Sequence, residues 1–125
     1  MPRIVIRWNG HALDAELLDT PTSEALLAVL PFEAKANTWG EEVYFDAPIA
    51  VKLETDAREV VDPGTVCFWV EGASLALPFG PTPVSRGDEC RLVTRVNVLG
   101  KIIGDPKSLQ SIRSGALVRV ERAKV

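Results

Sequence analysis

Histidine, cysteine and glycine-rich loops are scarce in this sequence of 125 residues, and each shortage excludes a class of function. The chain has one histidine and two cysteines. A nucleophilic triad at Ser85 would have to use His11, and no Gly-x-Ser-x-Gly motif surrounds that serine. His11, Cys67 and Cys90 lack metal-ligand spacing, and Gly100 and the glycines near it form no phosphate-binding loop. We therefore predict no metal site and no cofactor.

Basic runs and long apolar runs are also missing. Fourteen Lys and Arg residues face seventeen Asp and Glu residues, which gives a net charge of −3. Nucleic acids are bound by clustered basic residues, so we expect no nucleic-acid partner. With no signal-peptide pattern and no stretch long enough to span a bilayer, we expect a cytoplasmic protein without a membrane partner. In that reducing compartment the isolated Cys67 and Cys90 are expected to be unbridged.

The length predicts a single domain over residues 1–125. A chain of this size buries roughly two-thirds of the surface that its unfolded form exposes, which is enough for one core. Alternating apolar and polar residues predict short strands, among them 3–8, 11–17, 48–53, 65–70 and 95–103. The last of these is interrupted at Gly100, which indicates a bulge or a close backbone approach.

Two short helices are predicted among the strands. Thr20-Pro21 is typical of a helix start, and that helix should end before Pro31. Asp105-Pro106 predicts a second helix that continues through Ile112. About eight strands with two short helices favour a mainly β fold, either a closed barrel or a tight sandwich. The predicted core consists of Ile4, Ile6, Ala36, Val43, Phe45, Val66, Phe68, Leu75, Leu77, Val96 and Val98.

Residues 37–45 are dense in aromatic and polar side chains and predict a hairpin. With a two-residue loop at Trp39-Gly40, Asn37 would lie opposite Glu42 and Ala36 opposite Val43. A primed turn suits Gly40 but not Trp39, which favours a longer loop with Gly40 in the left-handed region. Glu41 and Glu42 are adjacent and should point to opposite faces, so they are not expected to share one substrate.

The same alternation places polar and aromatic side chains on the face opposite the core. Exposed aromatic rings beside amide and charged groups suit a groove that orients a ligand. The irregular segment 80–89 contains two prolines and two glycines, and long loops of this kind are often functional. The candidate ligand-binding residues are Asn37, Trp39, Glu42, Tyr44, Trp69, Phe79, Thr82, Ser85, Arg95 and Asn97.

Several ordered motifs resemble a known family. They are 37–45 (Asn-Thr-Trp-Gly-Glu-Glu-Val-Tyr-Phe), Arg58-Glu59-Val60-Val61, Pro63-Gly64 with Phe68-Trp69, 79–85 (Phe-Gly-Pro-Thr-Pro-Val-Ser) and 97–102 (Asn-Val-Leu-Gly-Lys-Ile). In this order they are similar to small prokaryotic cyclophilin-like proteins of unknown function, across nearly the whole chain. The resemblance implies a closed barrel of about eight strands with helices at its ends, and no established activity. Such barrels bind ligands on the outside because side chains fill the interior.

Three functions agree with these observations, which do not single out one of them. The first is binding of a small molecule or peptide in an outer-face groove. The second is weak prolyl isomerase activity, in which Arg95 would polarise the prolyl carbonyl, although the Phe-His-Arg and Phe-Met-Gln-Gly-Gly motifs of true cyclophilins are absent. The third is an accessory subunit of an amide-hydrolysing system, which the resemblance of the barrel to domains of oxoprolinase-like systems suggests. A second copy of the chain or a larger enzyme would then be the protein partner.

Overall fold

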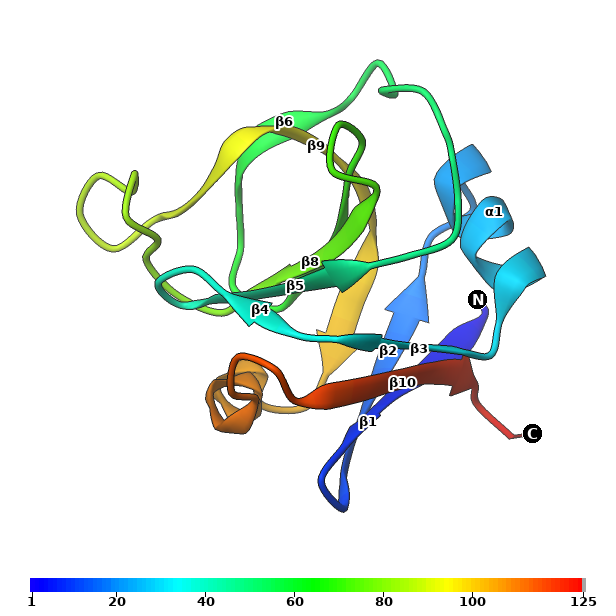
Figure 1. Ribbon diagram of the computed structural model, residues 1–125. Coiled ribbons are helices and arrows are strands. Elements are labelled where there is room, and N and C mark those ends of the chain that lie inside the picture. The colour runs from blue at the N-terminus through cyan, green and yellow to red at the C-terminus, as the bar shows by residue number, and fades with distance from the viewer. Residues whose placement is uncertain (125) are drawn as a thin grey trace.

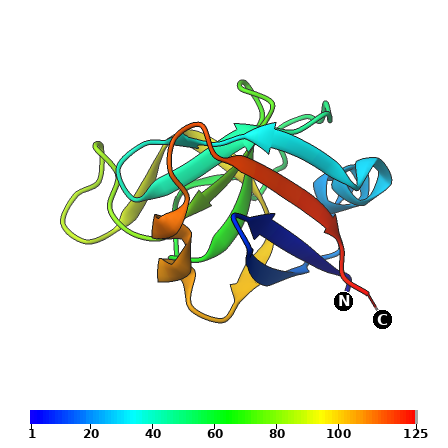
Figure 2. The same ribbon diagram turned by 60° about the horizontal axis from the view of Figure 1, so that its bottom comes forward.

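A computed structural model describes residues 1–124, and within them the chain forms one twisted sheet with two short helices (Figures 1 and 2). The strands are β1 (Arg3–Trp8), β2 (His11–Leu17), β3 (Phe32–Lys35), β4 (Asn37–Thr38), β5 (Glu42–Asp46), β6 (Arg58–Val61), β7 (Thr65–Trp69), β8 (Ser74–Pro78), β9 (Cys90–Ile103) and β10 (Leu117–Arg122). The helices are α1 (Pro21–Val29) and the 3-10 helix η1 (Pro106–Ser111). The mainly β class is confirmed.

The sheet has ten antiparallel strands in the order β3-β10-β1-β2-β9-β7-β8-β5-β4, and β6 pairs with β9 beside this path. The predicted closed barrel of about eight strands is not confirmed, because no hydrogen-bonded pair within residues 1–124 joins the two ends of this order. The ends nevertheless follow each other in the chain, with only Ala36 between β3 and β4. This stretch pairs with β10 at its start and with β5 at its end, which adds a strand to the count.

Both helices begin where the sequence predicts. Thr20 is the N-cap of α1, and its side chain accepts a hydrogen bond from the backbone N–H of Ser23 at 3.0 Å. Pro21 occupies the first turn of the helix. Asp105 caps η1 by accepting from the backbone N–H of Lys107 at 3.0 Å. These local bonds explain why such short segments are helical inside a sheet protein.

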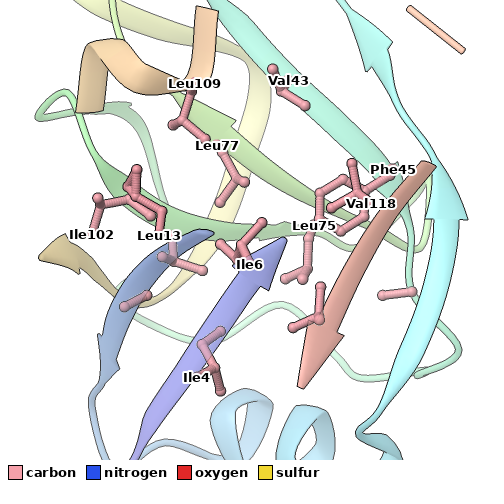
Figure 3. Close-up of a cluster of buried hydrophobic side chains, with 14 of the residues drawn as sticks. Ile4, Ile6, Leu13, Val43, Phe45, Leu75, Leu77, Ile102, Leu109 and Val118 are labelled. Atoms are coloured by element: carbon pink, nitrogen blue, oxygen red, sulfur yellow. The ribbon is translucent and has the colours of Figure 1, made fainter. Parts of the chain in front are cut away.

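The main hydrophobic core lies between the two halves of the sheet, as Figure 3 shows for side chains from β1, β2, β5, β8, β9 and β10. It contains the predicted core residues except Val96 and Val98. The alternation of β5 and β8 sends Val43, Phe45 and Leu77 into this core. The intervening residues of the same strands must therefore face the other side of the sheet.

A bulge in β9 explains the two exceptions. Val66 pairs with Gly100, but its neighbour Cys67 pairs with Val98, which leaves Leu99 without a partner on β7. Leu99 is fully buried in the main core. The residues before the bulge therefore have the opposite parity, and Val98 packs against a second cluster instead. The prediction that Val98 lies in the core was wrong for this reason.

The predicted strand 48–53 is also wrong, since this segment is irregular in the structure. Its larger apolar side chains become more exposed along the segment, from the buried Ile49 to the exposed Leu53, and among the described residues it pairs with no strand. Asn97 holds the segment instead, accepting from the backbone N–H of Glu54 at 2.7 Å and donating to the carbonyl of Lys52 at 2.9 Å. The alternation in the sequence thus marks no strand, and only Ile49 and Val51 of this segment pack against the main core.

Candidate functional site

The outer face of β5, β8 and β7 is covered by an arm formed by β6 and the first half of β9. Residues 90–96 of β9 pair with β6, whereas residues 97–101 pair with β7. Figure 1 shows this two-stranded arm on the side of β8 and β5 away from β1 and β10. A second cluster of buried side chains lies beneath the arm, formed by Val61, Cys67, Ala76, Cys90, Leu92 and Val96.

Beside this second cluster lies a pocket of about 220 Å³, which we call the aromatic pocket. The hairpin turn, the outer faces of β5, β7 and β8, and the first half of β9 all contribute to its walls. Its lining side chains are Trp39, Glu42, Tyr44, Trp69, Ala76, Leu92, Val93 and Val96. A largely apolar concavity with few polar groups is the common form of a small-molecule site.

Glu42 is the polar centre of the aromatic pocket. It is the first residue of β5 and points away from Val43, and only 6% of it is exposed. Its Oε1 atom is buried and has no hydrogen-bond partner among the described residues. Burial raises the pKa of the carboxyl from 4.5 to about 7. A carboxyl with such a pKa exists in both protonation states near neutral pH, as functional-site carboxyls often do.

Two aromatic rings form adjacent walls of the aromatic pocket. Tyr44 and Trp69 make an edge-to-face contact, with ring centroids 6.2 Å apart and an angle of 88° between their planes. The indole Nε1 of Trp69 is buried without a hydrogen-bond partner among the described residues. A buried indole N–H normally finds an acceptor, so the described residues leave the hydrogen-bonding capacity of this donor and of Glu42 Oε1 unused.

Two free thiols lie under this site. Cys67 and Cys90 are buried and unbridged, as predicted. Burial raises the pKa of the Cys90 thiol to about 11. Burial, followed by the nearby Glu42 charge, raises the pKa of the Cys67 thiol well above its usual range. Both thiols are therefore neutral near pH 7 and belong to the apolar packing beneath the aromatic pocket.

The hairpin turn that carries Trp39 and Glu42 differs from the predicted register. Asn37 pairs with Tyr44 instead of Glu42, because the loop is longer by two residues. A shift of two residues preserves the faces of both strands. Gly40 has a φ of +58°, which agrees with the expected left-handed conformation.

Comparison with known proteins assigns the fold to a family. The profile of the cyclophilin-like family matches residues 2–121. This chain belongs to the cyclophilin-like family. It is similar to the solution structure of the hypothetical protein AF2241 from Archaeoglobus fulgidus, with 35% sequence identity and a TM-score of 0.82. That alignment covers 98% of this chain and 95% of the archaeal one. A search of curated proteins found no match. The resemblance read from the sequence motifs is thus confirmed.

Four of the predicted site residues of this cyclophilin-like chain come together in the aromatic pocket: Trp39, Glu42, Tyr44 and Trp69. Phe79 instead lies in the main core. Asn97 is fully buried on the far side of β9, where it also donates to Thr22 Oγ1 at 2.9 Å. It does not line the aromatic pocket, because it holds α1 and the segment around Glu54 in place.

The loop residues Thr82 and Ser85 brace the site without lining it. Ser85 Oγ accepts from the backbone N–H groups of Thr82 at 2.9 Å and Arg91 at 3.1 Å. The loop packs against the hairpin turn, since the Glu41 N–H donates to the Pro81 carbonyl at 2.9 Å. The loop therefore positions the turn through backbone contacts, and its two hydroxyl groups also tie it to the backbone of Arg91 on β9.

Asn37 and Arg95 are exposed and also lie outside the pocket lining. The sequence analysis did not identify Leu92, Val93 or Val96 as lining residues. Their strand was expected to begin at Arg95, which left out Leu92 and Val93. The pairing of β6 with β9 is also irregular here, because Val60 pairs with Arg91 but Arg58 pairs with Val96. Val93 is 59% exposed at this irregularity, which is high for a valine in a strand. Val93, an apolar residue outside any alternating pattern, was the one sign in the sequence that this segment lines a pocket.

Within residues 1–124, no group of three or more His, Cys, Asp or Glu side chains is arranged to hold a metal ion. Within the same residues, neither helix has the length and apolar character needed to cross a membrane.

Proposed function

We propose that this cyclophilin-like protein binds a small molecule, or a side chain of a peptide, in the aromatic pocket on the outer face of its sheet. The observation that carries this proposal is a pair of buried polar atoms, Glu42 Oε1 and Trp69 Nε1, that have no partner among the described residues and belong to two side chains lining one pocket. Unpaired buried polar atoms are costly, and a ligand that bonds to them would remove this cost. The apolar lining would supply most of the contact area.

A ligand screen monitored by thermal unfolding tests the proposal. Ligands that bind the native state raise Tm, by an amount equivalent to about 2.7 kcal/mol when the ligand is at 100 times its Kd. Trp69→Ala should abolish the shift for every hit, because it removes one wall of the pocket. Asn37→Ala is the matched control, since Asn37 pairs with Tyr44 but lies outside the pocket lining. Hits that act equally on both variants would place the binding site elsewhere.

The two other functions predicted from the sequence depend on different experiments. Arg95 lies outside the aromatic pocket, so a prolyl isomerase mechanism that uses Arg95 gains no support from the pocket geometry. An isomerase assay on a proline-containing peptide tests that function directly. A role as an accessory subunit of an amide-hydrolysing system would be supported by co-purification with a larger enzyme.

A further inference from the structure

The electrostatic character of the aromatic pocket restricts the ligands that it can hold. Among the described residues, Glu42 is the one charged side chain in its lining, and three aromatic rings accompany it. A buried carboxylate repels anions and needs a counter-charge or a proton. The faces of Trp and Tyr rings carry negative charge density and attract cations, most strongly when water is excluded. Charge and ring content therefore both favour a cation.

We infer that the aromatic pocket binds a small alkylated ammonium cation, with Glu42 as its counter-charge and Trp39, Tyr44 and Trp69 as its aromatic walls. This inference rests on the proposed function and names its ligand class. The perpendicular rings of Tyr44 and Trp69 give two walls of a corner, and Trp39 adds a third aromatic side chain from the hairpin turn.

The apolar part of the lining distinguishes an alkylated ammonium group from a primary one. A primary ammonium group carries three N–H donors that need acceptors. The side chains of the lining offer only the Glu42 carboxylate and the Tyr44 hydroxyl as strong acceptors, while Leu92 and Val96 offer methyl groups. Methyl groups on the nitrogen would pack against these aliphatic side chains without unsatisfied donors.

The unpartnered Trp69 N–H adds a requirement for an acceptor on the ligand. Because Glu42 disfavours a second negative charge in the pocket, a neutral oxygen such as a hydroxyl suits this donor better than a carboxylate. A quaternary ammonium group with a hydroxyl a short distance away meets both requirements. Choline is therefore a suitable probe, and 3,3-dimethyl-1-butanol is its uncharged analogue with carbon in place of nitrogen.

The affinity for such a cation should depend on pH through Glu42. The pKa of about 7 means that roughly a tenth of these carboxyls are ionised at pH 6 and most are ionised at pH 8. Only the ionised form can pair with the cation, so the apparent affinity is proportional to the ionised fraction. It should therefore rise about tenfold from pH 6 to pH 8. The titratable groups around Glu42 are Glu41, Tyr44 on β5, Cys67 on β7 and Cys90 on β9. Two further charged residues, Arg58 on β6 and Asp62, act on the cysteine thiols. Both thiols stay neutral from pH 6 to pH 8, so Glu42 governs the change.

The test is a titration of the full chain with each probe, followed through the NMR signals of the indole N–H groups. Choline should shift the signals of Trp39 and Trp69 and leave that of Trp8, which lies in the main core, unchanged. Glu42→Gln should weaken choline binding at pH 8 at least tenfold and remove the pH dependence. Glu41→Gln removes a neighbouring carboxylate that does not line the pocket, and it should leave the affinity unchanged.

The results distinguish failure of the cation inference from failure of the proposed function. If 3,3-dimethyl-1-butanol binds as tightly as choline, or if choline affinity falls as pH rises, the cation inference is overturned while the pocket remains a binding site. If no compound in a library of cations and neutral molecules shifts the Trp39 and Trp69 signals, the proposed function fails as well. A peptide that contains trimethyllysine provides a second source of the same cation. Tighter binding of this peptide than of choline would support the inference with a protein ligand.

Discussion

At the scale of single residues, Glu42 and Asn97 show how a polar side chain can be buried for opposite reasons. Both are less than a tenth exposed. Asn97 has partners for both its oxygen and its nitrogen, whereas Glu42 Oε1 has none among the described residues. A satisfied buried amide stabilises the native state, but an unsatisfied carboxyl destabilises it. This cost at a pocket wall is the basis of the role proposed for Glu42.

Replacement of Glu42 by Gln should stabilise the protein at alkaline pH. The folded-state pKa of about 7 lies above the reference value of 4.5, so the folded chain binds more protons than the unfolded chain between these values. Stability therefore falls as pH rises through this window. The Glu42→Gln variant does not titrate there, so relative to the wild type it should gain about 2–3 kcal/mol from pH 5 to pH 8. Urea unfolding of both proteins at both pH values measures this gain. An equal difference at both pH values would show that Glu42 ionises normally.

Replacement of Asn97 by Ala should lower stability without any direct effect on the pocket. The substitution leaves the Glu54 N–H and the Lys52 carbonyl without their partner, and we expect a cost of about 2–4 kcal/mol. Asn37→Ala is the matched control: Asn37 is exposed, and its loss should change stability by less than about 0.5 kcal/mol. Chemical denaturation of the two variants measures the difference. Similar values for both would mean that Asn97 does not hold the segment around residue 54.

At the scale of elements, local signals in the sequence predicted most helix starts and strand faces. The pairing between distant segments could not be predicted from them. Capping residues identified both helix starts, because a cap acts within one turn of chain. Alternation identified the faces of β5, β7 and β8, and so placed Tyr44 and Trp69 opposite the core. It failed for the residues before the bulge at Leu99, because an unpaired residue in one strand reverses the parity of the residues that precede it. Gly100 indicated a bulge or a close approach, but it did not identify the unpaired residue.

The candidate site was predictable to the same extent. The hairpin turn and β7 supplied its aromatic residues from short-range patterns. Asn97 was misplaced because it precedes the bulge at Leu99, which reverses its parity. The lining residue Leu92 was missed because its strand begins five residues earlier than expected. The pairing of β6 with β9 forms the cover of the pocket, and a contact between strands thirty residues apart is not encoded in either strand alone.

The backbone of β2 approaches β9 closely at Gly100. A Cβ atom added there would lie 2.0 Å from the carbonyl oxygen of Glu16 on β2. Gly100→Ala should therefore separate β2 from β9, at a cost of about 3 kcal/mol. Gly87→Ala is the control, because a Cβ atom there meets open space and only its positive φ opposes the change, at about 1–2 kcal/mol. Thermal unfolding compares the two, and a smaller cost at Gly100 would contradict the close approach.

At the scale of the whole molecule, the sheet serves two purposes on its two faces. The inner face packs into the main core and carries most of the buried apolar surface. The outer face of β5, β7 and β8 packs under the β6–β9 arm, where the packing is incomplete and leaves the aromatic pocket. A site on the outer face can vary in its side chains without loss of the core, because a fold does not by itself determine the function of the sites on it.

Adjacent residues on β7 provide the test of this division. Phe68 is 1% exposed in the main core, and Phe68→Ala should cost about 3–5 kcal/mol through loss of buried surface and a residual cavity. Trp69 is a larger side chain on the opposite face, but it is only partly buried at the pocket wall. Trp69→Ala should cost less, about 1–2 kcal/mol, and should abolish binding in the aromatic pocket. Denaturant unfolding and ligand titration on both variants measure the two effects. A cost below about 1 kcal/mol for Phe68→Ala, or intact binding in Trp69→Ala, would mean that the faces of β7 do not divide stability from binding in this way.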